Sequence, residues 1–146
     1  MQKIKLNNKN LKIQVNDDGE YIVLPFEDKT FIHRFYKMID DFKEVESSFI
    51  DKGKLIDELE DSIDEFGISS KERKFMELDL EIHTFLKEQI DLLFGENTCK
   101  KVFGDIVPSF VLITEFLDEI SPFIEIHLKE KIKVINKYSA EREGNV

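Results

Sequence analysis

The spacing of the apolar residues changes after Pro25, and this change constrains the fold more than any other feature of the chain. Before Pro25, apolar and polar residues alternate in short runs that are separated by the turn-forming segments 7–8 and 17–19. After Pro25, apolar residues recur every three or four positions. A period of two is typical of β-strands, and a period near 3.6 is typical of α-helices. The sequence therefore predicts a β segment over residues 1–25 and helices over residues 28–138.

The β segment is expected to form an antiparallel hairpin or a three-stranded meander. Its alternating apolar residues are Ile4, Leu6, Leu11, Ile13, Val15, Tyr21 and Val23. Every charged residue from Met1 to Gln14 is a lysine, which places a small basic patch on an otherwise acidic chain. Exposed lysines discourage edge-to-edge pairing of strands, and a binding role for the patch is the alternative.

The first helix is expected to extend from Phe31 to Phe49, with Thr30 or Asp28 as its N-cap. We expect Gly53 to end this pattern and a second, shorter helix to follow over residues 55–66, ending at Gly67.

A third helix is expected to begin at Ser69, which forms a capping-box pattern with Glu72, and to end at Gly95. A short helix over residues 98–103 should follow and end at Gly104.

The C-terminal part contains a further apolar stripe over residues 110–120, and we expect Pro122 to kink or interrupt this helix. A last amphipathic helix should extend from about Phe123 to Tyr138, and residues 139–146 should form a flexible tail. The predicted fold is mainly α with a small N-terminal antiparallel β-hairpin or meander (α+β), built as a bundle of about five helices. Residues 1–138 are expected to form a single domain.

Charge and cysteine content restrict the function classes. The 21 basic and 31 acidic residues give a net charge of −10, which opposes binding to nucleic-acid phosphates and to anionic membranes. The longest uncharged run, residues 106–114, is far shorter than the roughly 18 apolar residues that a membrane span requires. With Cys99 as the only cysteine and no signal-peptide pattern, we expect a protein of the cytoplasm.

Catalytic, cofactor and metal sites are not expected. His33, His83 and His127 are far apart in the sequence and belong to no HExxH pattern. Cys99 has no neighbouring base that the sequence identifies. The three Phe-Gly pairs are interpreted as helix ends, because none of them follows a strand as a phosphate-binding glycine loop would.

One acidic cluster leaves an alternative open. Asp57, Asp61 and Asp64 would lie on one helical face, at spacings i, i+4 and i+7, where carboxylates can hold magnesium. Glu88 and Asp91 form an ExxD pair that resembles the second magnesium-binding pair of the all-α nucleoside triphosphate pyrophosphatases. The first pair of that family, ExxE, is not matched, and Asp57-x-x-Glu60 or Asp61-x-x-Asp64 would have to replace it. A solvated acidic face explains the same residues without catalysis.

The segment from Leu92 to Gly104 resembles the tail assembly chaperones of long-tailed phages that infect Gram-positive bacteria. In that family a helix ends in a similar Phe-Gly-Glu-Gly-Thr segment, followed by a short helix, a second Phe-Gly pair and a hydrophobic C-terminal helix pair. Asn97 stands where the family has glycine, and asparagine also tolerates the left-handed backbone conformation.

The resemblance implies a non-enzymatic protein that binds the tape measure protein and helps to recruit tail tube subunits. It also implies a protein that is encoded by a phage or a prophage and acts in the cytoplasm of the host cell. Such a protein is absent from the finished virion. We expect the partner to contact apolar residues of the C-terminal helices, namely Phe110, Phe116, Phe123 and Ile126. The alternative functions are a magnesium-dependent pyrophosphatase and a small cytoplasmic adaptor. The stripe from Phe31 to Phe49 could close on the chain's own core or on a second copy, so a homo-oligomer stays open.

Overall fold

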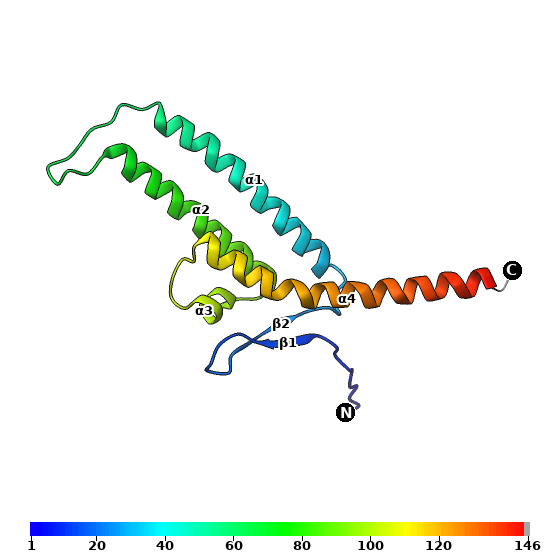
Figure 1. The fold of residues 1–146 in the computed structure, drawn as a ribbon. Helices are drawn as coiled ribbons and strands as arrows, with labels where there is room; N and C mark the ends of the chain where they lie inside the picture. The colour runs from blue at the N-terminus through cyan, green and yellow to red at the C-terminus, as the bar shows by residue number, and fades with distance from the viewer. Residues whose placement is uncertain (145–146) are drawn as a thin grey trace. The chain divides into compact units, whose positions relative to one another are not determined.

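The computed structural model describes residues 1–144 and divides into two compact units, Met1–Phe110 and Val111–Val146. The first unit contains β1 (Leu11–Gln14), β2 (Tyr21–Leu24), α1 (Phe31–Asp57), α2 (Ser70–Phe94) and α3 (Thr98–Phe103) (Figure 1). The second unit consists of α4 (Phe110–Gly144) apart from its first residue. The mainly helical fold with an N-terminal hairpin is confirmed, but residues 1–144 form four helices instead of about five. The single domain expected over residues 1–138 stays a prediction.

The N-terminal hairpin pairs β1 with β2 in antiparallel register, with Leu11 opposite Leu24 and Gln14 opposite Tyr21. Its turn is closed by the Asn16 side chain, whose Oδ1 accepts hydrogen bonds from two backbone N–H groups of residues 18 and 20. Ile4 and Leu6 are both more than 80% exposed and belong to no strand, so the sheet has two strands rather than the three of a meander. An alternating apolar pattern does not by itself form a strand, because one face of the strand must pack against another apolar surface.

α1 runs without a break through Gly53 to Asp57, so the prediction that Gly53 separates two helices was wrong. A glycine inside a helix costs only about 1 kcal/mol relative to alanine, which tertiary packing overrides. A Cβ atom placed on Gly53 would lie 3.6 Å from Cε1 of Phe75 in α2, so the glycine sits where the two helices approach closely. The predicted helix over residues 55–66 is accordingly absent, and residues 58–69 form the loop between α1 and α2.

α1 and α2 lie side by side and antiparallel as a helical hairpin (Figure 1). The core of the first unit gathers where this hairpin meets β2. Phe31 is fully buried there, with ring centroids 5.9 Å from Phe26 and 6.1 Å from Phe94, both in edge-on geometry. Leu24 of β2 and Ile90 of α2 are also fully buried. The alternating pattern of β2 and the 3.6-residue pattern of the helices therefore supply one common core.

The predicted ends of α2 and α3 are confirmed. The Ser69 hydroxyl accepts a hydrogen bond from the Glu72 backbone N–H, as the capping pattern requires. α2 and α3 end before Gly95 and Gly104, which both have positive φ. Asn97 precedes α3 with φ of 65°, in the left-handed region that asparagine tolerates.

The predicted kink or interruption at Pro122 is not an interruption, because α4 continues through the proline as one helix. Proline lacks the N–H that would bond to the carbonyl four residues earlier, which removes one helical hydrogen bond. The Ser121 hydroxyl donates to the Leu117 carbonyl at 2.7 Å, one position before the proline. The helix also includes residues 139–144, where an aperiodic tail was expected, while residues 145–146 lie outside the described part of the chain.

Candidate protein-binding surfaces

The four residues predicted to bind a partner differ in accessibility. Phe110 is 54% exposed and Ile126 is 57% exposed, while Phe123 is 38% exposed. Phe116 is only 7% exposed and shares one helical face with the buried residues Ile113 and Ile120. Phe123 and Ile126 lie three positions apart, so they form a neighbouring pair on the surface of α4. Binding of a partner by any of the four residues stays a prediction.

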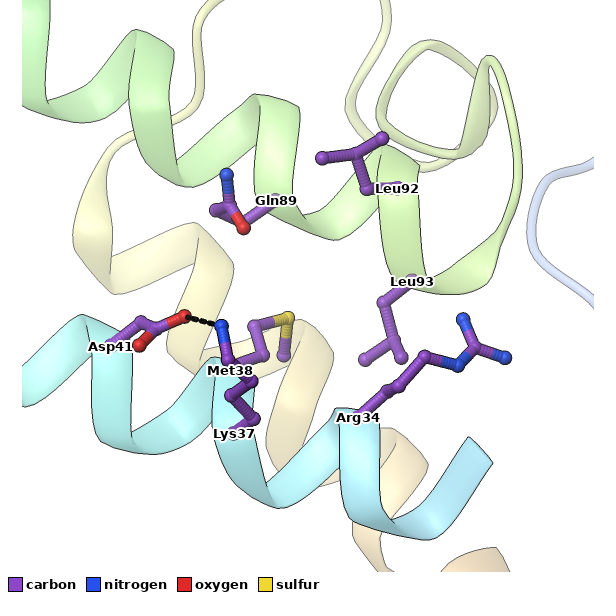
Figure 2. Close-up of a pocket in the computed structure, with 7 residues that line it drawn as sticks. All are labelled: Arg34, Lys37, Met38, Asp41, Gln89, Leu92 and Leu93. Carbon is purple, nitrogen blue, oxygen red and sulfur yellow. Dashed lines mark hydrogen bonds and ion pairs between the residues drawn. The ribbon is translucent and has the colours of Figure 1, made fainter. Parts of the chain in front are cut away.

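A pocket of about 200 Å³ lies between α1 and α2 (Figure 2). It is lined from α1 by Arg34, Lys37, Met38 and Asp41 and from α2 by Gln89, Leu92 and Leu93. Its cations already have partners, because Lys37 Nζ lies 3.3 Å from Asp41 Oδ2 and Arg34 Nη2 lies 3.1 Å from Asp28 Oδ2. With the buried Met38 and Leu93 in its wall, the pocket suits an apolar side chain better than an anion.

A second, more apolar groove of about 230 Å³ lies farther along the same helical hairpin. Its lining residues are Phe42, Val45, Glu46, Phe49, Asp79, Ile82, His83, Leu86 and Phe110. The His83 ring nitrogen Nδ1 lies 2.7 Å from the Asp79 carbonyl oxygen, which accepts its proton in a local hydrogen bond. Both grooves therefore offer apolar contact area without a nucleophile paired to a base.

The free end of the α1–α2 hairpin, residues 57–81, carries more exposed apolar side chains than sequence reasoning assigned to the surface. We call this segment the hairpin end. Its large exposed apolar residues are Leu59, Ile63, Phe66, Ile68, Met76 and Leu80. Leu59, Ile63 and Phe66 would lie on one apolar face of the helix predicted over residues 55–66, and they are exposed because residues 58–69 form a loop.

The carboxylates of the hairpin end hold its loop together instead of lining one helical face. Asp61 Oδ1 accepts hydrogen bonds from the Ser69 hydroxyl at 2.7 Å and from the Ser70 hydroxyl at 3.3 Å. Asp64 Oδ1 accepts from the backbone N–H groups of Phe66 and Ile68. The prediction that Asp57, Asp61 and Asp64 share a helical face was wrong, because the helix ends at Asp57.

These hydrogen bonds also change the acidity of the loop. The Ser69 hydroxyl, followed by the Lys71 backbone N–H, holds the pKa of Asp61 below its ordinary value. Hydrogen bonds from the backbone N–H groups of Ile68 and Phe66 lower the pKa of Asp64 in the same way, assisted by the charge of Arg73. Both carboxylates are therefore held in their ionised form as structural acceptors.

In the second acidic pair, Glu88 and Asp91, the Asp91 carboxylate forms a hydrogen bond that stabilises the fold. Asp91 Oδ1 accepts a hydrogen bond from the backbone N–H of Cys99 at 2.8 Å, while Glu88 is exposed. Within residues 1–144, no three side chains of His, Cys, Asp or Glu converge as a metal site would require. The magnesium hypothesis thus has no converging ligand set in the described part of the chain.

Cys99 is fully buried, and its thiol lies 3.5 Å from the Lys87 carbonyl oxygen. Burial, together with the negative charge of Asp91, raises the pKa of this thiol to about 12. A thiol with so high a pKa is a poor nucleophile at neutral pH. Cys99 is best described as a small core residue.

None of the described helices has both the length and the apolarity needed to cross a bilayer. Comparison of the chain with protein-family models, with curated proteins and with solved structures found no match in any of the three.

Proposed function

We propose that this protein is a phage tail assembly chaperone that acts without catalysis by binding the tape measure protein and helping to recruit tail tube subunits. The observation that carries the proposal is the exposure of large apolar side chains on helices of a strongly acidic chain. On α4 these side chains include Phe110, Phe123 and Ile126. A partner rich in hydrophobic helices can cover such residues, and burying apolar surface contributes roughly 25 cal/mol per Å².

The acidic composition supports the same role. A complex that contains long hydrophobic helices stays dispersed when one component carries a large net charge, and this chain carries −10. Phenylalanine suits such a contact because it offers a large area with only two rotatable side-chain bonds. The 13 phenylalanines exceed what the buried core uses, since Phe66, Phe110 and Phe123 are exposed.

Co-expression tests the binding role. The tape measure protein encoded in the same phage genome is produced with and without this chain, and its soluble fraction is measured. We expect the tape measure protein to be soluble only in the presence of this chain and to elute with it. An insoluble tape measure protein, with this chain eluting alone, would contradict the proposal.

A nucleotide assay tests the non-enzymatic role. The purified chain is incubated with each nucleoside triphosphate and magnesium, and released pyrophosphate is measured. We expect no turnover. Magnesium-dependent turnover that is lost in Glu88→Ala and Asp91→Ala variants that remain folded would instead support the pyrophosphatase alternative.

A further inference from the structure

Two surfaces of this chain carry opposite charges that are not neutralised within the described residues. The hairpin end, residues 57–81, contains ten acidic and three basic residues, for a net charge of −7. Lys71 and Arg73 pair with Asp57 and Asp64, at 3.4 and 3.5 Å, and Lys52 of α1 pairs with Glu81 at 3.9 Å. Glu58, Glu60 and Glu65 form no ion pair among residues 1–144, so the hairpin end has an excess of free carboxylates beside exposed apolar side chains.

The C-terminal part of α4 has the opposite charge. Residues 127–142, which we call the basic segment, contain five basic and two acidic residues, for a net charge of +3. Lys131, Lys133 and Lys137 are exposed and form no ion pair in the part of the chain that the structure describes. On a chain whose net charge is −10, this is a local reversal of sign.

The basic segment also continues an apolar helical face. In the first turns of α4 this face is buried at Ile113, Phe116, Ile120 and Ile124. Helical spacing extends the face through Leu128 to Ile135 and Tyr138, which are 62% and 65% exposed. The same face is therefore buried in the first half of the helix and exposed in the second.

We propose that the basic segment of one copy of this chain docks on the hairpin end of a second copy. Each surface offers exposed apolar side chains within a field of one sign, and the two signs are opposite. Contact between two basic segments, or between two hairpin ends, would place like charges together and is disfavoured. The contact is consequently heterologous, and repeated use of it links copies head to tail into a ring or an open row. This inference is independent of the proposed function.

Light scattering coupled to size exclusion tests the self-association of the full chain. At low salt we expect the mean mass to rise with concentration to at least about two-fold the monomer mass, because one contact already joins two copies. At about 1 M salt, where the Debye length is about 3 Å, we expect the mass to fall back towards 17.2 kDa. A wild-type chain that stays at the monomer mass throughout would overturn the proposal.

Charge reversal at exposed positions identifies the two surfaces. One variant carries Lys131→Glu, Lys133→Glu and Lys137→Glu, and the other carries Glu58→Lys, Glu60→Lys and Glu65→Lys. Circular dichroism verifies that both remain helical. We expect each variant alone to be monomeric and an equimolar mixture to associate to about two-fold the monomer mass, because the unchanged basic segment of the second variant (+3) still meets the unchanged hairpin end of the first (−7). Association of either variant alone at the wild-type level, or failure of the mixture to associate while the wild type does, would overturn the head-to-tail contact.

Discussion

The carboxylate of Asp91, near the end of α2, accepts a hydrogen bond from the backbone N–H of Cys99 in the first turn of α3, at 2.8 Å. The first N–H groups of a helix have no partner within the helix, so Asp91 acts as the cap that α3 lacks from Asn97. This bond fixes α3 against α2.

Replacement of Asp91 by alanine should destabilise the first unit. Loss of a capping acceptor costs about 1 kcal/mol, and we expect Asp91→Ala to lower the free energy of unfolding in urea by that amount. Glu88→Ala, at an exposed position on the same helix, is the matched control and should change it by less than about 0.5 kcal/mol. Equal effects of the two substitutions would show that Asp91 is not a cap.

Gly53→Ala should stabilise the protein. The added Cβ meets Phe75 Cε1 at 3.6 Å, an ordinary van der Waals distance, and alanine is favoured over glycine in a helix by about 1 kcal/mol. Gly67→Ala is the opposite control, because φ of 78° at that position costs an alanine about 1–2 kcal/mol. Thermal unfolding measures the change in stability of each variant. A destabilised Gly53→Ala variant would show that α1 and α2 pack too closely at this position to accept a Cβ atom.

Acid should weaken the loop between α1 and α2. The pKa of Asp61 is lower in the folded chain than in the unfolded chain, chiefly because the Ser69 hydroxyl donates to it. Its contribution to stability is therefore complete above the unfolded pKa near 3.9 and is lost as the pH falls through the lower folded pKa. We expect Ser69→Ala to raise the pKa of Asp61, as followed by carboxyl chemical shifts, and Ser70→Ala to raise it less. An unchanged Asp61 titration in Ser69→Ala would contradict this hydrogen-bond assignment.

Cys99 should be unreactive in the folded protein. Its full burial and a pKa raised to about 12 leave almost no accessible thiolate at pH 8. We expect a thiol reagent such as DTNB to label Cys99 slowly in buffer and rapidly in concentrated urea. Fast labelling of the native protein would show that α3 opens readily or that the thiol is not buried.

Local sequence signals predicted the parts of the fold that are stabilised locally. The Ser69 cap and the glycines at 95 and 104 depend on backbone groups within a few residues, so the sequence alone was sufficient to predict them. Gly53 was interpreted as a break and Pro122 as a kink or an interruption, because their local propensity opposes a helix. In both cases the helix continues, because packing and the remaining hydrogen bonds outweigh one unfavourable residue.

The candidate surface was less predictable than the fold. The apolar residues at 59, 63 and 66 have helical spacing, so they were expected to be buried. Their exposure depends on where α1 ends, and a one-dimensional pattern does not determine this. Asp61 and Asp64 were predicted to lie on a helical face, but α1 ends before them. They lie instead in the loop, which their hydrogen bonds stabilise.

Exposed apolar residues of α4 are the proposed contact with the tape measure protein, and co-elution of variants with that protein tests this contact most directly. The double variant Phe123→Asp/Ile126→Asp is compared with the wild type and with Leu55→Asp, a control at a position that is 64% exposed in α1 and lies outside the surfaces described above. We expect the double variant to remain helical and to lose co-elution, while Leu55→Asp retains it. Wild-type co-elution by a folded double variant would contradict the account.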